Sequence, residues 1–298
     1  MLKTFVVGAS GLIGHAYWLT CRQRFPDCIG TQHARVLPDL VRFDLLQPDL
    51  ASLALRESAH EGALIAAACT RVAACDQEPE KSRRINVDGT ACLVRQLDQY
   101  NLPVLFLSSD YVFSGVTGGY DESAHVGPTT EYGRQKVELE QQIGELHRQG
   151  LVVRLSKVYG LQHGDGTLLD EMAKELVAGR PMTAADDQIF CPTFVDDVVR
   201  VLGQLQEQAV RGVIHVCHPE PCSRYELALA LAEALDVDPR LVRRVSLHTL
   251  PGMQNRPLNT SMSIKRLEQI SAPEFLSWRT AVRRVAANYQ AIKGVRPV

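Results

Sequence analysis

Short apolar runs alternate with longer amphipathic segments through the first half of the chain. The runs are rich in β-branched and aromatic residues and end at glycine or polar residues, which is typical of buried strands. They lie at residues 3–10 (KTFVVGAS), 28–31, 41–43, 62–68, 102–109 and 151–156. Helical periodicity fills the longer intervals, at residues 12–25, at 78–100 closed by Asn101, and at 130–150 closed by Gly150. This alternation predicts an α/β fold with a Rossmann-type doubly wound parallel sheet.

The alternation becomes less regular after residue 156. Helices are expected at residues 166–179, 193–208, 223–235 (with Ser223 as N-cap) and 278–289, and a strand at 212–216. No repeat, low-complexity tract or linker interrupts the pattern. We therefore expect residues 1–156, with a contribution from about 185–216, to form the dinucleotide-binding Rossmann domain. Residues 157–298 are expected to form a smaller α/β substrate-binding lobe interleaved with the first.

Composition narrows the class of protein without naming it. The 298 residues are 45% hydrophobic and 22% charged, which is ordinary for a soluble enzyme. A net charge of −2 without a basic stripe argues against a nucleic-acid partner. No apolar run approaches the roughly 20 residues of a membrane span, and the N-terminal run is too short and too broken by glycine for a signal peptide. These features predict a cytoplasmic protein.

Eight cysteines are scattered along the chain without a CxxC pair, which fits free thiols in a reducing cytoplasm. One cluster, HVCHPEPC, superficially resembles a metal site. Its candidate ligands are His215, Cys217, His218 and Cys222. The segment alternates as a strand that enters a proline-rich turn, so these side chains are expected to point in different directions. We expect no metal.

The segment GASGLIG places Gly8, Gly11 and Gly14 between the first strand and the first helix. In a Rossmann turn, glycine lets the backbone approach a pyrophosphate, and the helix N-terminus offers unpaired N–H groups and a positive dipole end. The spacing is GxxGxxG, and glycine trios also serve turns and close packing. Because the turn follows the first strand of an alternating chain, we interpret it as a dinucleotide site.

The end of the second strand bears on which dinucleotide is bound. NAD-binding sites usually place a carboxylate there for the 2′-hydroxyl of the adenine ribose. Here the segment contains Gln32, His33 and Arg35, and Asp27 precedes the strand, at the wrong end. A missing carboxylate and a nearby arginine favour NADP(H) over NAD(H); the alternative is that Arg35 is simply solvated.

The segment EYGRQK puts Tyr132 four residues before Lys136 at the start of a predicted helix. An exposed pair at this spacing is the structural alternative. The fifth strand, however, ends at Ser108 and Ser109, at the edge where open α/β sheets bind ligands. A phenol can protonate the oxygen of a carbonyl that receives hydride, an ammonium nearby is expected to lower the phenol's pKa, and a serine hydroxyl can bind the oxygen. We interpret Ser109, Tyr132 and Lys136 as a catalytic trio.

Taken together, the chain resembles the extended short-chain dehydrogenase/reductases. The motifs that carry the resemblance span nearly the whole chain: GASGLIG, AAACTRVAACDQEPEKSRRINVDGT, SSDYVFSG, YGRQK, VVRLSKVYG, CPTFVDDV and NRPLNTSMS. Within that family it looks most like the dTDP-4-dehydrorhamnose reductases of carbohydrate biosynthesis and the related regulatory β subunit of methionine adenosyltransferase. The resemblance implies an NADPH-dependent oxidoreductase that reduces the 4-keto group of a nucleotide-linked deoxysugar, with a homodimer as one option for its assembly.

The resemblance also assigns residues to sites. Cofactor contacts fall on the first helix and on the ends of the first strands: Gly8, Ser10, Gly11, Leu12, Ile13, Gly14, His33, Arg35, Asp44, Leu45, Ala66, Ala67, Ala68, Ser108, Tyr132 and Lys136. Substrate contacts fall on Thr70, Val72, Ser109, Asp110, Tyr111, Lys157 and Arg256. Arg256 is expected to face the nucleotide or its phosphates, and Asp44 the adenine.

Two alternatives stay open. A regulatory subunit could keep the fold and NADP(H) while it acts through a partner, and an epimerase or dehydratase would share the tyrosine–lysine pair. Dehydratases tend to carry Asp-Glu after the serine or threonine, whereas this chain has Asp110-Tyr111. Rhamnose-forming reductases carry a tryptophan where this chain has Lys157, which puts the rhamnose precursor in doubt as the substrate.

Overall fold

The computed structural model describes residues 1–53, 55, 59–147 and 149–294. Its centre is a parallel sheet of β1 (Thr4–Val7), β4 (Gly62–Ile65), β5 (Val104–Ser109), β6 (Leu151–Leu155) and β11 (Gly212–Val216), in the order β1-β4-β5-β6-β11. A parallel bridge between Val6 and Gly30 adds β2 (Thr31–Gln32), which pairs with β3 (Val41–Arg42). The resulting order, β3-β2-β1-β4-β5-β6-β11, confirms the predicted Rossmann-type sheet.

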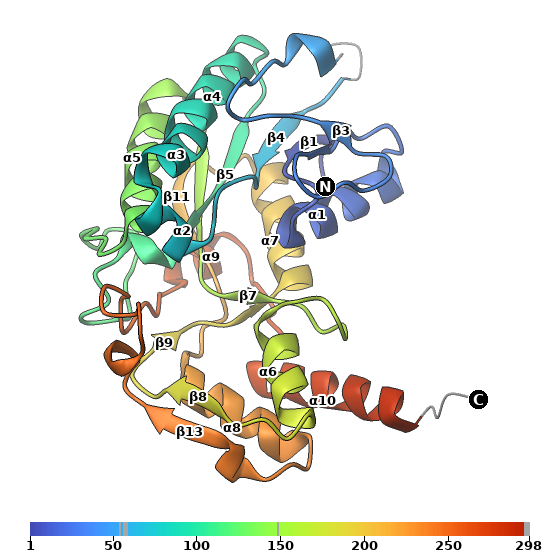
Figure 1. Ribbon diagram of the computed structural model, residues 1–298. Coiled ribbons are helices and arrows are strands. Elements are labelled where there is room, and N and C mark those ends of the chain that lie inside the picture. The colour runs from blue at the N-terminus through green and yellow to red at the C-terminus, as the bar shows by residue number, and fades with distance from the viewer. Residues whose placement is uncertain (54, 56–58, 148, 295–298) are drawn as a thin grey trace.

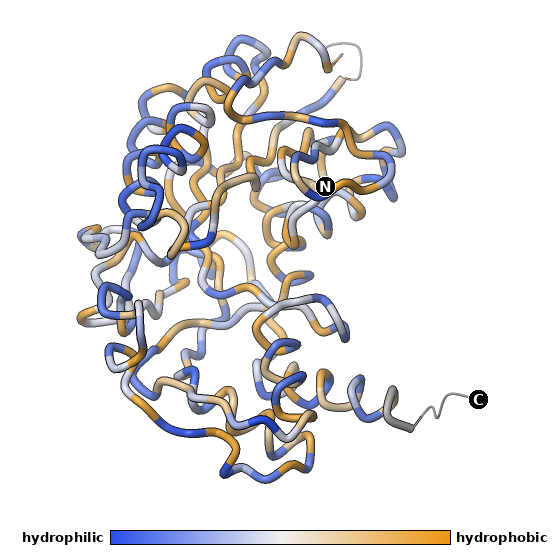
Figure 2. Tube along the Cα trace, viewed as in Figure 1, coloured by the Kyte–Doolittle hydropathy of each residue, from blue (hydrophilic) through white to orange (hydrophobic). Residues whose placement is uncertain are grey.

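Helices cover both faces of this sheet (Figure 1). On one face lie α1 (Leu12–Arg24) and α7 (Val195–Glu207). On the other lie α2 (Val72–Gln77), α3 (Pro79–Arg83), the π-helix Arg84–Gly89, α4 (Thr90–Gln99) and α5 (Glu131–Leu146). Successive strand residues point to opposite faces, so Val6 packs in one hydrophobic cluster while Phe5 and Val7 pack in another. Figure 2 shows the sheet strands as largely hydrophobic and the outer turns of the helices as polar.

A second group of elements lies beyond the carboxyl ends of the strands (Figure 1). It contains α6 (Leu168–Val177), α8 (Arg224–Ala234), α10 (Trp278–Gly294) and the parallel pair β8 (Met182–Ala185) and β13 (Val242–Val245), with its own hydrophobic cluster. Ser223 caps α8 in a capping box with Glu226, as its sequence predicts. The domain boundaries proposed above stay a prediction.

Short paired segments connect the two groups. β7 (Val158–Tyr159) pairs with β10 (Thr193–Phe194), and β9 (Ile189–Phe190) pairs with β12 (Cys222–Ser223). The remaining short helices are α9 (Lys265–Ile270) and four 3-10 turns at Ala51–Leu53, Asp110–Val112, Pro239–Leu241 and Leu247–Thr249.

Two predicted helices differ in detail. The segment 78–100 is helical but passes through a π turn, and Asn101 does close it with a φ of 53°. The helix predicted to reach Gly150 ends at Leu146. His147 takes extended backbone there, because its buried ring nitrogen Nε2 lies 2.9 Å from the carbonyl oxygen of Leu102. The prediction of that helix end was wrong because it depended on a tertiary contact.

In the described part of the chain, no helix combines the length and apolar character that crossing a bilayer requires. All eight cysteines have free thiols.

A buried ionic network joins α5 to β6 behind the sheet edge. Arg154 pairs with Glu140 at 2.7 Å, and Ser108 donates its hydroxyl to the same carboxylate. His215 completes the network: its Nε2 lies 3.5 Å from Nη1 of Arg154, and its Nδ1 lies 3.2 Å from the carbonyl oxygen of Ser263. These partners suit a neutral ring that donates from Nδ1 and accepts at Nε2. Burial and the charge of Arg154 lower the pKa of His215 to about 4.

The shifted pKa of His215 makes stability depend on pH. Between the ordinary pKa of 6.5 and about 4, the unfolded chain takes up a proton that the folded chain refuses. The free energy of unfolding should therefore fall as pH falls through this window. His215→Gln should make that decline shallower by roughly 3 kcal/mol, measured by denaturant unfolding at several pH values. His125→Gln, at an exposed histidine, is the control; equal slopes in all three proteins would contradict the assignment.

Close approach of α5 to the end of β5 depends on Gly133. A Cβ atom there would lie 2.2 Å from the carbonyl oxygen of Tyr111, whereas one at Gly144 on the same helix would meet nothing within 4 Å. Gly133→Ala should lower the free energy of unfolding by roughly 1–3 kcal/mol through overpacking. Gly144→Ala should raise it by up to about 1 kcal/mol through helix propensity. Chemical denaturation of both variants tests this, and a neutral Gly133→Ala would show that the approach is not tight.

Candidate functional site

One large cavity lies at the carboxyl ends of the sheet strands, between the sheet and the second group of elements. Its volume is about 1370 Å³. Open α/β sheets bind ligands at this edge. The lining contains every residue that the sequence assigned to cofactor or substrate, from Gly8 at one end to Arg256 at the other. The fold therefore gathers into one place side chains that lie far apart in the sequence.

The glycine turn forms one wall of this cavity. Gly8 has a φ of 90°, and a Cβ atom there would lie 2.6 Å from the backbone nitrogen of Ala67. A Cβ atom at Gly14 would lie 2.3 Å from the carbonyl oxygen of Gly8, so the helix can pack this closely only without a side chain. No side chain caps α1, whose N-cap is Gly11. The free N–H groups at this helix start and the glycine backbone suit a pyrophosphate.

The far end of the same wall carries the residues expected at the adenine ribose. Arg35 is exposed, and its Nη1 lies 3.4 Å from the carbonyl oxygen of Ser10 in the glycine turn. Nε2 of His33 lies 3.8 Å from Oδ2 of Asp44. The amide of Gln32 is used internally, because it donates to the carbonyl oxygen of Leu40 at 2.8 Å. The groups open to a ligand here are therefore Arg35 and the His33–Asp44 pair.

Ser109, Tyr132 and Lys136 meet at the centre of the cavity wall. All three are buried side chains, with exposed fractions of 9%, 9% and 5%. Tyr132 and Lys136 lie on the first turns of α5, whose N-cap Thr130 accepts the N–H of Gly133 at 3.2 Å. Nζ of Lys136 donates to the carbonyl oxygen of Leu107 at 2.8 Å and lies 5.7 Å from the ring centre of Tyr132. The helix is thereby joined directly to β5, the strand that ends in Ser109.

The pKa of Tyr132 runs against the expectation from the sequence. Burial raises it above the ordinary phenol value, the negative charge of Asp110 adds to this, and a hydrogen bond with Ser109 only partly opposes it. Lys136, whose expected effect was to lower this pKa, is not among the main groups that shift it. The phenol of Tyr132 therefore keeps its proton at neutral pH.

Lys136 is itself strongly shifted. Burial lowers its pKa to about 8, although the carboxylate of Glu140, one helical turn further along α5, favours the charged form. An ammonium with this pKa can exchange its proton near physiological pH, which perturbed lysines at functional sites commonly do.

Asp110 is the most heavily hydrogen-bonded carboxylate of the site. It accepts the hydroxyls of Ser109 at 3.1 Å, Ser156 at 3.0 Å and Thr260 at 2.7 Å. Burial nevertheless raises its pKa. Ser156 and Thr260 were not singled out from the sequence, although both lie in motifs quoted above. Their hydroxyls fix Asp110, and Asp110 in turn fixes Ser109.

The substrate half of the cavity combines predicted and unpredicted residues. Thr70 is exposed in the lining and Val72 begins α2. Arg256 is in the wall as predicted, but its Nη1 lies 3.2 Å from Oδ2 of Asp76. Arg224 also lines the cavity, and nothing in the sequence pattern marked it. It is the first residue of α8, which only the tertiary fold brings to this place.

The cysteine–histidine cluster is spread over separate contacts. Nδ1 of His215 faces the carbonyl of Ser263, whereas the thiol of Cys217 donates to Met262 and Cys222 starts β12. Across the described residues, no three His, Cys, Asp or Glu side chains are grouped to hold a metal ion.

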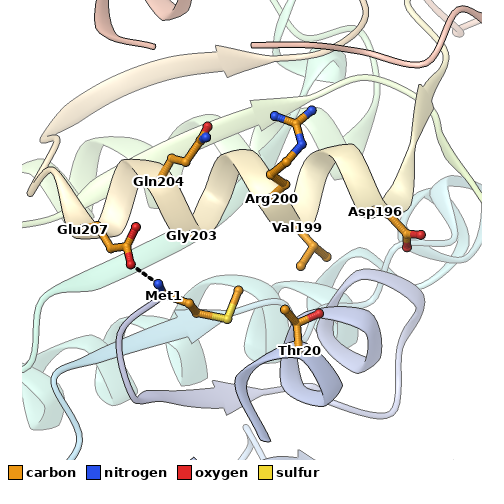
Figure 3. A pocket seen from close by; sticks show the side chains of 8 residues that line it. All are labelled: Met1, Thr20, Asp196, Val199, Arg200, Gly203, Gln204 and Glu207. Carbon is orange, nitrogen blue, oxygen red and sulfur yellow. Dashed lines mark hydrogen bonds and ion pairs between the residues drawn. The ribbon is translucent and has the colours of Figure 1, made fainter. Parts of the chain in front are cut away.

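A second cavity, of about 340 Å³, lies between α1 and α7 (Figure 3). It is lined by Met1, whose amino group pairs with Glu207, and by Thr20 and residues of α7. It shares no residue with the large cavity and contains none of the predicted site residues.

Known proteins resemble this chain over 74–94% of its length. A dTDP-4-dehydrorhamnose reductase of Mycolicibacterium smegmatis is 30% identical over 74% of this chain and 68% of its own. Methionine adenosyltransferase 2 subunit beta of Bos taurus is 25% identical over 94% and 86%. The crystal structure of a hypothetical dTDP-4-dehydrorhamnose reductase from Sulfolobus tokodaii is 26% identical, covers 93% of this chain and 98% of its own, and superposes with a TM-score of 0.82.

Residues 2–291 match the family described as the RmlD substrate binding domain. Since this match covers almost the entire chain, the protein belongs to that family and has the fold of the extended short-chain dehydrogenase/reductases.

Proposed function

We propose that the protein reduces the 4-keto group of a nucleotide-linked deoxysugar with NADPH. The observation that carries this proposal is a single cavity whose lining contains both the glycine turn and Ser109, Tyr132 and Lys136. The relative from Mycolicibacterium smegmatis, a dTDP-4-dehydrorhamnose reductase, supports the same class of substrate. The nucleotide and the sugar are parts of the proposal, as is a cytoplasmic homodimer as its working form.

The residues of the glycine turn fit a dinucleotide. The backbone N–H groups near Gly11 and the start of α1 would hold the pyrophosphate, and Arg35 would hold the 2′-phosphate that distinguishes NADPH from NADH. The cavity wall formed by Ala66–Ala68 and Leu45 would enclose the rest. When bound there, NADPH supplies the hydride.

The protein's own residues manage the oxygen of the keto group. When the substrate binds, the single proton of the Ser109 hydroxyl turns from Asp110 to that oxygen, where negative charge accumulates. Tyr132, protonated at neutral pH because burial raises its pKa, gives its phenolic proton to the same oxygen. Lys136 keeps positive charge beside the phenol once the proton has left. Asp110 accepts the hydroxyl of Ser109 until the substrate oxygen takes its place.

A regulatory role is the second candidate, and the similarity to methionine adenosyltransferase 2 subunit beta favours it. Such a protein would keep the cavity and act by contact with a partner. An epimerase or dehydratase is less well supported, because Tyr111 occupies the position where dehydratases tend to have Glu.

Removal of the Tyr132 hydroxyl tests the reductase proposal. Tyr132→Phe should lower turnover by about 100-fold or more, because the proton donor is lost while the ring still packs in the wall. The assay follows NADPH oxidation by purified protein with dTDP-4-keto-6-deoxyglucose. Tyr225→Phe, a tyrosine outside the cavity, is the matched control and should retain activity.

Two results would contradict the proposal. Equal activity of Tyr132→Phe and wild type would remove Tyr132 from the chemistry. No turnover of any keto-sugar nucleotide, together with NADPH binding and co-purification of a methionine adenosyltransferase, would instead establish the regulatory role.

The choice of cofactor depends on Arg35. Arg35→Gln should weaken NADPH binding by about tenfold, since one charge-assisted contact to a phosphate is lost. Binding of NADH, which lacks that phosphate, should change little. Fluorescence titration with both cofactors measures this; an equal loss for both, or for neither, would show that Arg35 does not read the 2′ position.

A further inference from the structure

Two cations line the substrate half of the cavity without a direct ion-pair partner among the described residues. Within the described residues, the ammonium of Lys157 and the guanidinium of Arg224 have no hydrogen-bond acceptor, and neither belongs to an ion pair. By contrast, the neighbouring Arg256 is paired with Asp76, and Arg154 with Glu140. Arg224 is half-buried and Lys157 is exposed to the cavity, and the two positive charges act on each other. Because like charges side by side repel, an arrangement that keeps two of them together favours an anionic ligand.

The backbone of both residues is fixed by short hydrogen bonds. The carbonyl of Lys157 accepts the N–H of Thr193 at 2.9 Å, next to the paired strands β7 and β10. The N–H of Arg224 donates to the carbonyl of Gln188 at 3.0 Å, which ties the start of α8 to the cavity wall. Two different elements therefore present these side chains to one space.

Few charged groups act on the side chains of Lys157 and Arg224. Burial and the positive charge of Arg224 lower the pKa of Lys157, and burial also lowers the pKa of Arg224. Glu171 on α6 favours the charged form of both, and Asp110 favours that of Lys157. Asp110, however, already accepts three hydroxyls, and Glu171 is exposed. Neither carboxylate neutralises the pair by direct contact.

The position of Lys157 indicates which part of a substrate it meets. In the sheet register, Ser109 lies opposite Leu155, two residues before Lys157. The intervening Ser156 donates to Asp110 at 3.0 Å, and Asp110 follows Ser109 in the chain. Lys157 therefore lies beside the centre where the keto oxygen is expected to bind. In a nucleotide-linked sugar, the ring separates the diphosphate from the keto oxygen. A substituent on the ring has no such separation, so it is the part of the substrate that Lys157 is expected to meet.

We propose that Lys157 and Arg224 form an anion-binding subsite, and that the sugar preferred by this protein carries a carboxylate on its ring. The planar fork of Arg224 can bind both carboxylate oxygens, and the ammonium of Lys157 adds a point charge. This inference rests on the proposed function, because it names the substrate class of the same cavity.

A pair of binding probes tests the subsite. dTDP-glucose and dTDP-glucuronate differ only in a hydroxymethyl group against a carboxylate, and neither can be oxidised by protein loaded with NADPH. Isothermal titration should show the glucuronate binding at least about tenfold more tightly than the glucose derivative. Lys157→Met and Arg224→Gln should each reduce this preference towards unity, with little change in the affinity for dTDP-glucose. Lys265→Met, an exposed lysine outside the cavity, should retain the full preference.

The outcomes separate this inference from the proposed function. Equal binding of both probes by the wild-type protein, with NADPH oxidation by a neutral keto sugar intact, would overturn the subsite alone. A loss of affinity for both probes in Lys157→Met would show that the cations hold the diphosphate, which also overturns it. If neither probe binds, both the subsite and the proposed function fail.

Discussion

The contact of α5 with the end of β5 is the constraint on which the site depends. Gly133 lets the helix approach the carbonyl of Tyr111, and Lys136 donates to the carbonyl of Leu107. One turn further on, Glu140 is held by Arg154 and by the hydroxyl of Ser108. These contacts fasten one helix face to one strand, so that Tyr132 comes to Ser109 without any adjustment by a ligand. Such preorganised groups stabilise developing charge without reorganisation cost.

The burial that this packing requires also sets the chemistry. It keeps the proton on Tyr132 and makes the ammonium of Lys136 easier to deprotonate, with a pKa of about 8. A phenol that holds its proton suits reduction, in which the oxygen of the substrate must gain one. Lys157 and Arg224 lie near each other in the cavity wall, without an ion-pair partner among the described residues. The packing of α5 against β5 therefore determines both the geometry of the site and the protonation of Tyr132 and Lys136.

The sequence was sufficient to predict the sheet and the glycine turn, because strong local signals carry them. The resemblance to a known family named many residues that line the cavity, but not Arg224, Ser156 or Thr260. β1, β4 and β5 are fully buried apolar runs, and Ser223 begins a capping box. The strands β7, β8, β9, β10, β12 and β13 were missed, since runs of two to four residues show no clear periodicity. Local signals also could not predict the end of α5, because it depends on the contact of His147 with Leu102. They could not predict the direction of the pKa shift of Tyr132 either, because burial determines it.

The partners of Asp110 show the same limit most clearly. Ser156 and Thr260 lie 46 and 150 residues further along the chain, so only the completed fold identifies them. Arg224 likewise becomes a cavity residue only because α8 starts next to Gln188. Its proposed role in an anion site was inferred from the structure, in which its guanidinium has no hydrogen-bond acceptor or ion-pair partner among the described residues.

Transfer of a labelled hydride tests the central claim most directly, because it reports the bond made at the keto carbon. The protein would be incubated with NADPH deuterated at the reactive carbon of the nicotinamide and with dTDP-4-keto-6-deoxyglucose, and the recovered sugar nucleotide analysed by mass spectrometry and NMR. The account predicts deuterium bound to carbon 4 of the sugar. Recovery of the sugar without deuterium, although the labelled NADPH is bound, would contradict it.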